Sequence, residues 1–131
     1  MPTGPLPPEL AAFLHAPRPA VVATTRADGS PLTAPTWYVM EDAHVLLTMG
    51  PDGARGRNLR RDGRFSLSVL APNWYSHVTV ECRVAEIRED ADYADLHRIA
   101  AHYDSDYEPE AAAITVRGAI ERWHVFGKPA G

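Results

Sequence analysis

Residues 48–69 read TMGPDGARGRNLRRDGRFSLSV, and three local patterns meet in this stretch. A strand ends at Met49, a loop with Gly50 and Gly53 follows, and residues 54–62 have the composition of a short arginine-rich helix. From 64 to 69, apolar residues alternate with serine, which is typical of a strand with one buried face. This order favours a small sheet with short connections between its strands.

Further strands are expected on the N-terminal side of this stretch. Residues 20–25 and 44–49 are apolar and rich in β-branched side chains. Residues 32–40 form the return strand of a hairpin around Asp28-Gly29, a dipeptide that favours a type I′ turn. With a second reversal at Glu41-Asp42, the pattern predicts that the three strands form a meander.

The C-terminal half continues in the same way. Residues 78–84 alternate like a strand, and 113–125 are interpreted as the last strand. A helix is expected from a cap at Asp90 to about residue 103, and another over 7–14. The sequence thus predicts a mainly β protein, a six-stranded antiparallel β-barrel with short helices, in a single domain over residues 1–131.

Bulk composition narrows the classes of function. The chain of 131 residues has a formal net charge of −4, which argues against a general nucleic-acid binder. Its apolar runs are too short for a membrane span, and the start at Met1 resembles no signal peptide, so we expect a cytoplasmic protein. Cys82 is the only cysteine, so we expect no internal disulfide and interpret Cys82 as a small buried apolar residue.

Strands 20–25 and 44–49 are apolar on both faces. A closed barrel buries only its inner face, so the second apolar face predicts a partner surface, most simply an identical subunit.

Arginines gather in the opening stretch. Five of the twelve arginines lie between Arg55 and Arg64, after a glycine-containing loop and at the start of a helix. Helix N-termini favour anions and arginine donates bidentate hydrogen bonds to phosphate, so this segment suits a phosphate or phosphodiester. A solvated basic helix face is the plain alternative, and a nucleic-acid patch is disfavoured by the acidic total.

Other side chains give weaker signals. The six histidines lack metal-ligand spacing, so no metal site is expected. Trp74, Tyr75 and His77 are interpreted as structural packing, with projection into a partner's site as the alternative. The acidic run 104–110 is interpreted as a solvated loop, with a loop that folds over a pocket as the alternative.

Five pieces of the sequence, in this order, carry a resemblance to a known family. The pieces are Ala-Asp-Gly-Ser-Pro at 27–31, Pro-Thr-Trp-Tyr at 35–38, Thr48, Arg-Gly-Arg-Asn-Leu-Arg-Arg-Asp at 55–62, and Arg-Phe-Ser-Leu-Ser-Val at 64–69. Over residues 7–126 the chain resembles the pyridoxamine 5′-phosphate oxidase-like split barrels, and within them it looks most similar to the actinobacterial flavin/deazaflavin oxidoreductases.

The resemblance implies a six-stranded split β-barrel homodimer with two cofactor sites at the subunit interface. The cofactor is either FMN or F420, a deazaflavin with a phosphodiester and an oligoglutamate tail. By resemblance, Pro35, Thr36 and Trp37 lie along the ring of the cofactor. The implied contacts to its phosphate and polar tail come from four residues: Thr48, Arg55, Arg57 and Asn58. Met49, next to Thr48, is also expected to contact the cofactor.

The function that follows is an F420-dependent oxidoreductase that transfers a hydride to a small conjugated or electron-poor organic acceptor. No catalytic residue stands out, because such a cofactor carries the chemistry. The first alternative is an FMN-dependent oxidase or reductase of the same fold. The second is a non-catalytic carrier or sensor, favoured by Gly53, where many relatives have a basic residue, and by Cys82, where they have glycine.

Overall fold

The computed structural model describes residues 2–129. Its elements are α1 (Pro8–His15), β1 (Ala20–Thr25), β2 (Pro31–Thr36), β3 (Val39–Glu41), β4 (His44–Met49), α2 (Ala54–Arg61), β5 (Arg64–Leu70), β6 (His77–Glu89), the 3₁₀ turn η1 (Ala91–Tyr93), α3 (Ala94–His102) and β7 (Ile114–Phe126). The mainly β fold is confirmed, with seven strands in place of six because the return strand expected over 32–40 is broken into β2 and β3.

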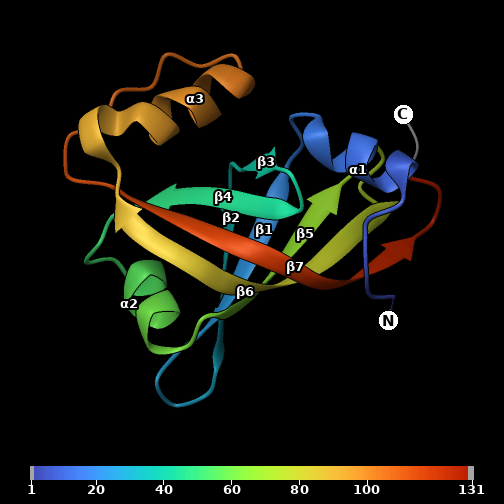
Figure 1. Cartoon of the computed structure of the whole chain (residues 1–131), viewed down its shortest axis with the longest axis horizontal. Coiled ribbons are helices and arrows are strands. Elements are labelled where there is room, and N and C mark those ends of the chain that lie inside the picture. Colours follow the sequence, from blue (N-terminus) through green and yellow to red (C-terminus); the bar gives the residue numbers. More distant parts are fainter. Residues whose placement is uncertain (1, 130–131) are drawn as a thin grey trace.

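All seven strands belong to one antiparallel sheet in the order β2-β1-β5-β6-β7-β4-β3 (Figure 1). Strands β2 and β3 are its two edges, yet only Trp37 and Tyr38 separate them in sequence. Three Cα–Cα steps reach about 11 Å at most, whereas a flat sheet of seven strands is about 29 Å wide. The sheet therefore curls until its edges approach, which gives a barrel split between β2 and β3.

Both strand pairings of the predicted meander are present, since β2 pairs with β1 and β3 pairs with β4. Its continuous middle strand is wrong, because residues 32–40 break into β2 and β3 at opposite edges of the sheet, and β4 pairs on its other side with β7 from the far end of the chain. The break has a visible cause at Tyr38, whose side chain is buried and whose hydroxyl donates a 2.7 Å hydrogen bond to the Leu14 carbonyl. That bond holds Trp37 and Tyr38, the two residues between β2 and β3, against the end of α1. The chain therefore leaves one edge of the sheet after β2 and joins the other edge at β3.

The hairpin between β1 and β2 is present, but its turn is not type I′. A type I′ turn needs positive φ at both central residues, and here only Gly29 has one, at +87°. The Arg26 amide donates to the Ser30 carbonyl and the Gly29 amide to the Arg26 carbonyl. The loop thus has one more residue than predicted, and Gly29 supplies the left-handed position that follows a tighter turn.

The barrel interior is filled by alternate side chains of the strands, including Phe65, Leu67, Val80 and Cys82. Cys82 is buried there, and burial raises the pKa of its thiol, so it is a small apolar core residue as expected. Gly118 faces the Phe65 ring so closely that a Cβ would lie 2.4 Å from Phe65 Cζ. The tight fit at this point depends on glycine.

Strand β4 is apolar on both faces, but its outer face is already covered within one chain. Val45 and Leu47 belong to the barrel core, while Leu46 points the other way and is also fully buried. The expectation that β4 needs a partner subunit is therefore wrong. On β1 the alternate residues Val21 and Ala23 are only half-buried, so that strand keeps a partly open outer face.

Helix α3 stands beyond one end of the sheet, and α1 lies on the opposite side of the molecule (Figure 1). Among the helices of residues 2–129, none is long and apolar enough to cross a membrane.

Candidate functional site

A cavity of about 970 Å³ lies between the barrel and α3, and we call it the central cavity. Its wall combines the approach to β1, the end of β2 with Trp37, the end of β4, one arginine of α2, the inner face of α3 and the segment before β7. The lining residues are Pro17, Arg18, Pro19, Ala20, Pro35, Thr36, Trp37, Thr48, Met49, Gly50, Arg55, Leu96, Ile99, Ala100, Tyr103 and 107–113.

Barrel closure explains why these distant segments meet. Pro35 and Thr36 end the edge strand β2, and Thr48 and Met49 end β4, next to the opposite edge. The central cavity therefore lies where the split barrel brings its two edges together. The structure gathers six of the eight residues predicted to contact a cofactor at this cavity: Pro35, Thr36, Trp37, Thr48, Met49 and Arg55.

Trp37 and Tyr38 are neighbours in sequence with opposite roles. Tyr38 is anchored in the core, and burial raises the pKa of its hydroxyl. Trp37 lines the cavity, is 41 % exposed, and stacks on Tyr103, the residue after α3, with ring centroids 5.2 Å apart and planes at 11°. Tyr38 thus fixes the barrel split, while Trp37 forms part of the cavity wall.

Arg55 has a buried side-chain nitrogen that lacks a hydrogen-bond partner. Among residues 2–129, its Nη1 is the one buried side-chain nitrogen or oxygen without a hydrogen-bond partner. Burial lowers the pKa of the Arg55 guanidinium, since desolvation disfavours the charged form. A half-buried cation with an unpartnered donor at a cavity wall favours an anionic group opposite it.

Arg57 and Asn58 do not reach the central cavity. Arg57 is exposed and its Nη1 donates a 2.6 Å hydrogen bond to the Asp52 carbonyl, which braces the loop before α2. Asn58 is buried: its Nδ2 donates to Thr24 Oγ1 at 3.1 Å, and its Oδ1 accepts from Arg61 Nη2 at 3.0 Å. In this structure both residues position α2, on which Arg55 stands.

Sequence reasoning missed the α3 side of the cavity. The helix was predicted, but its place at the cavity was not: Leu96, Ala100 and Tyr103 line the cavity. The acidic run 104–110 was interpreted as a solvated loop, with a pocket cover as the alternative. Three residues of that run line the cavity, namely Tyr107, Glu108 and Glu110, which agrees with the alternative. Helical spacing shows which residues share a face but not what that face borders.

Trp74 and Tyr75 were expected to be packed within the chain, and this is wrong. They are 71 % and 69 % exposed. Tyr75 contacts Phe126 edge to face at 5.1 Å between centroids, and His77 stacks on the same ring. These aromatic side chains form an exposed group outside the central cavity.

A comparison with protein-family models decides the family. The model of the pyridoxamine 5′-phosphate oxidase family matches residues 6–125, nearly the whole chain. The chain belongs to the pyridoxamine 5′-phosphate oxidase family. Membership agrees with the resemblance seen in the sequence. None of the curated proteins compared with the chain matches it.

Solved structures share the fold of this pyridoxamine 5′-phosphate oxidase family member. A structure named F420 reductase has a TM-score of 0.84 at 21% identity, with 91% of this chain and 98% of that chain covered. A conserved hypothetical protein from Mycobacterium tuberculosis has a TM-score of 0.74 at 25% identity, covering 95% and 86%. A FAD-binding protein from Mesorhizobium loti has a TM-score of 0.67 at 25% identity, covering 94% and 96%. Family membership supports an oxidoreductase, and the solved structures support the fold.

Proposed function

We propose that this chain is an F420-dependent oxidoreductase that reduces a small conjugated or electron-poor organic acceptor in the central cavity. The observation that carries the proposal is Arg55, a cation at the cavity wall whose Nη1 is buried without a partner. The structure named F420 reductase, which shares the fold at a TM-score of 0.84, adds support.

The cavity suits a cofactor of this size and character. Its volume of about 970 Å³ is at the upper end of ligand pockets, which run from roughly 300 to 1,000 Å³. Prolines, alanines and aromatic side chains make up most of its wall, and the polar or charged side chains among them are Arg18, Thr36, Thr48, Arg55, Glu108 and Glu110. Such a wall accepts a flat ring system and orients it by a few polar contacts.

The residues at the cavity divide into two groups by chemistry. Pro35, Thr36 and Trp37 offer the flat, largely apolar surface for the ring. Thr48 and Arg55 supply a hydroxyl and a guanidinium for the phosphate, and Met49 adds an apolar side chain to the wall. When bound, the deazaflavin or flavin supplies the hydride, and the chain supplies binding, orientation and a site shielded from water.

Arg57 and Arg60 favour the deazaflavin. Both are exposed on α2, the helix that carries Arg55, and both donate to carbonyls of the preceding loop. A long anionic tail that leaves the cavity past Arg55 would meet their positive charge.

FMN is the second candidate, and a specific observation favours it. Of the four residues in the expected phosphate clamp, Arg57 and Asn58 already bond within the chain, which leaves Thr48 and Arg55 at the cavity. That smaller set suits a phosphomonoester on a short chain. In either case we propose a cytoplasmic homodimer with the cofactor sites at its interface and a small molecule as substrate.

The experiment is hydride transfer to a panel of enones and quinones, monitored by oxidation of reduced F420 and, in parallel, of reduced FMN. Turnover with reduced F420 supports the proposal. Turnover with FMN alone assigns the second candidate. Tight binding of either cofactor with no turnover on any acceptor would overturn the enzyme proposal in favour of a carrier or sensor.

A further inference from the structure

Helix α3 forms a wall of the central cavity with little apolar attachment to the sheet. Ile99 and Ala100 are its buried residues, and both line the cavity together with Leu96 and with Tyr103, the residue after the helix. A helix in a protein is normally held by packing of its apolar face. On α3 that face is shared with the cavity, so other contacts must fix its position.

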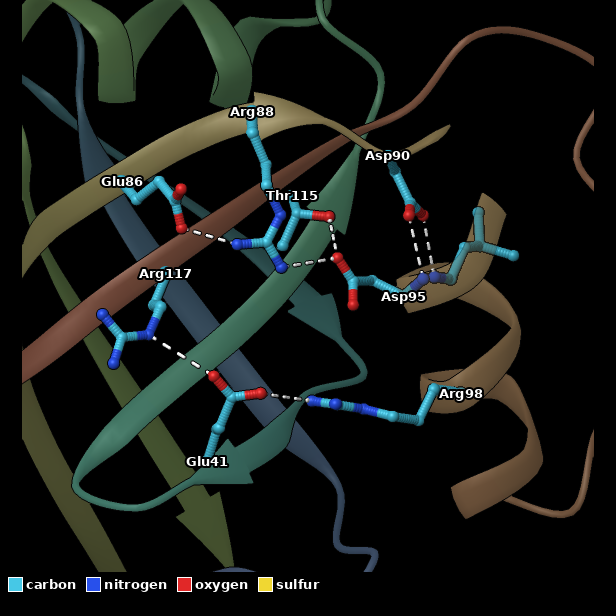
Figure 2. Close-up of polar contacts among 9 residues, drawn as sticks. Glu41, Glu86, Arg88, Asp90, Asp95, Arg98, Thr115 and Arg117 are labelled. Atoms are coloured by element: carbon cyan, nitrogen blue, oxygen red, sulfur yellow. Dashed lines mark hydrogen bonds and ion pairs between the residues drawn. The ribbon is translucent and has the colours of Figure 1, made fainter. Parts of the chain in front are cut away.

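The first of these contacts are at the N-terminal end of α3 (Figure 2). The Asp95 carboxylate accepts a 2.7 Å hydrogen bond from Thr115 on β7 and a 3.0 Å ion pair from Arg88 on β6. Glu86 holds the other side of the Arg88 guanidinium at 2.5 Å. Burial raises the pKa of Asp95, but the bonds from Thr115 and Arg88 outweigh it and leave the pKa below its ordinary value.

A second contact lies one turn further along the helix. Glu41, on the edge strand β3, accepts from Arg98 of α3 at 3.2 Å and from Arg117 of β7 at 3.5 Å (Figure 2). Its carboxylate thereby joins the helix to two strands. We call the polar side chains that join α3 to the sheet the latch, namely Glu41, Arg88, Asp95, Arg98, Thr115 and Arg117.

Tyr103, the residue after α3, joins the C-terminal end of the helix to the barrel. Tyr103 stacks on Trp37 and its hydroxyl donates a 2.7 Å hydrogen bond to the Arg18 carbonyl. Trp37 and Tyr103 both line the central cavity. A planar ligand that stacks on the Trp37 face covered by Tyr103 would compete with the Tyr103 ring for the same place.

The segments on either side of α3 contain residues with left-handed backbone conformations, which are candidate hinges. Asp92 and Tyr93 before the helix have φ of 55°, and Asp104 after it has φ of 57°. Residues other than glycine are uncommon in this left-handed region and cost energy there, so such positions mark segments whose conformation the surrounding structure imposes. Three of them flank one helix, at the places where a rigid-body movement would be absorbed.

We propose that α3 is a movable lid on the central cavity, held shut by the latch at one end and by the Trp37–Tyr103 stack at the other. The lid turns on the hinges at residues 92–93 and 104 and opens to admit ligands. The movement follows from the contacts of α3 alone, whereas its gating role rests on the proposed function of the cavity.

The movement is tested by hydrogen exchange on the ligand-free protein. The variant Glu41→Gln/Asp95→Asn weakens the latch while keeping the size of both side chains. We expect amide exchange in residues 94–102 to rise about tenfold, since exposed ion pairs and hydrogen bonds to charged groups are individually modest. Exchange in β5 and β6 should stay unchanged. The matched control is Glu81→Gln, which removes a 2.7 Å pair with Arg122 on β6 and β7.

Unchanged exchange in α3, or a rise that extends equally over the barrel strands, overturns the lid. Gating is then tested by stopped-flow binding of FMN and of F420 to the same variants. The latch variant should bind about three to ten times faster than wild type and Glu81→Gln at the wild-type rate. Faster exchange with an unchanged association rate overturns gating. If neither cofactor binds while exchange rises as expected, the lid stands and the proposed function fails.

Discussion

Arg55 and Arg57 lie two residues apart on α2 and meet different surroundings. Side chains at this spacing point to different sides of a helix. Arg55 is half-buried at the central cavity, while Arg57 is exposed and bonds the Asp52 carbonyl. The Arg-Gly-Arg-Asn motif at 55–58 predicts a phosphate contact for both arginines. In the structure they lie on different sides of α2, and only Arg55 lines the cavity. We therefore assign the main charge contact of the site to Arg55.

We predict that Arg55→Gln weakens cofactor binding by about 10- to 100-fold. A hydrogen bond to a charged group is worth about 1.5–3 kcal/mol, and each 1.4 kcal/mol corresponds to tenfold. The measurement is the dissociation constant of the tighter-binding cofactor by fluorescence. The control is Arg122→Gln, a surface residue paired with Glu81 outside the cavity. An unchanged dissociation constant for Arg55→Gln would remove this residue from the site.

Gly118 provides a prediction about stability. An alanine Cβ at this position would lie 2.4 Å and 2.5 Å from two atoms of the Phe65 ring, which is itself buried. Overpacking of this kind costs about 1–3 kcal/mol, so Gly118→Ala should lower the free energy of unfolding in urea by that amount. Gly50→Ala is the control, because a Cβ there meets nothing within 4 Å. Equal stability of the two variants would contradict the tight packing described for the barrel interior.

At the scale of elements, sequence patterns located most segments but not all of their limits. β1 and β4 have the predicted bounds, because each is a short apolar run between clear turn residues. The break between β2 and β3 could not be predicted, since Trp37 and Tyr38 are both compatible with a strand. Their separation depends on the bond from Tyr38 to Leu14, which is distant in sequence.

Asp90 was predicted to cap a helix, and it does so across an intervening turn. Helix α3 begins at Ala94, after η1, and the Asp90 carboxylate accepts the amides of Asp95 and Leu96 at 2.8 Å each (Figure 2). Sequence alone could not show that the chain inserts a 3₁₀ turn between the cap and the helix.

Loss of this cap should loosen α3. We expect Asp90→Ala to lower the free energy of unfolding by about 1–2 kcal/mol, the usual cost of removing a capping side chain. Asp90→Asn keeps an acceptor oxygen and should recover part of this loss. Thermal unfolding of both variants beside wild type gives the comparison. Asp90→Ala with wild-type stability would show that the two amide bonds do not fix the start of the helix.

At the scale of the whole molecule, the order of the strands places the site. The central cavity exists because the two edges of the sheet approach each other, and this closure follows from long-range pairings such as β4 with β7. Single-sequence patterns predicted the alternation within each strand and the pairings of strands adjacent in sequence, but not long-range pairings such as β4 with β7. Thr48 and Arg55 were found through a local motif, whereas the α3 wall required the full topology.

The assembly can be tested on the whole protein. β1 keeps a half-exposed apolar face, and Trp74, Tyr75 and Phe126 are exposed large side chains. Exposed aromatic groups are enriched in protein interfaces, so we predict a homodimer. Light scattering at several concentrations should give twice the chain mass of 14.4 kDa. A mass of one chain throughout would rule out the proposed interface sites.

The measurement that tests the central claim most directly is an equilibrium titration of the ligand-free protein with F420 and, in parallel, with FMN, followed by fluorescence. The structure places an unpartnered cation and an aromatic side chain at one cavity. We predict saturable binding of F420 that is tighter than binding of FMN. Selective binding of FMN would move the protein to the second candidate. Failure of both cofactors to bind would contradict the proposal that the central cavity is a flavin or deazaflavin site.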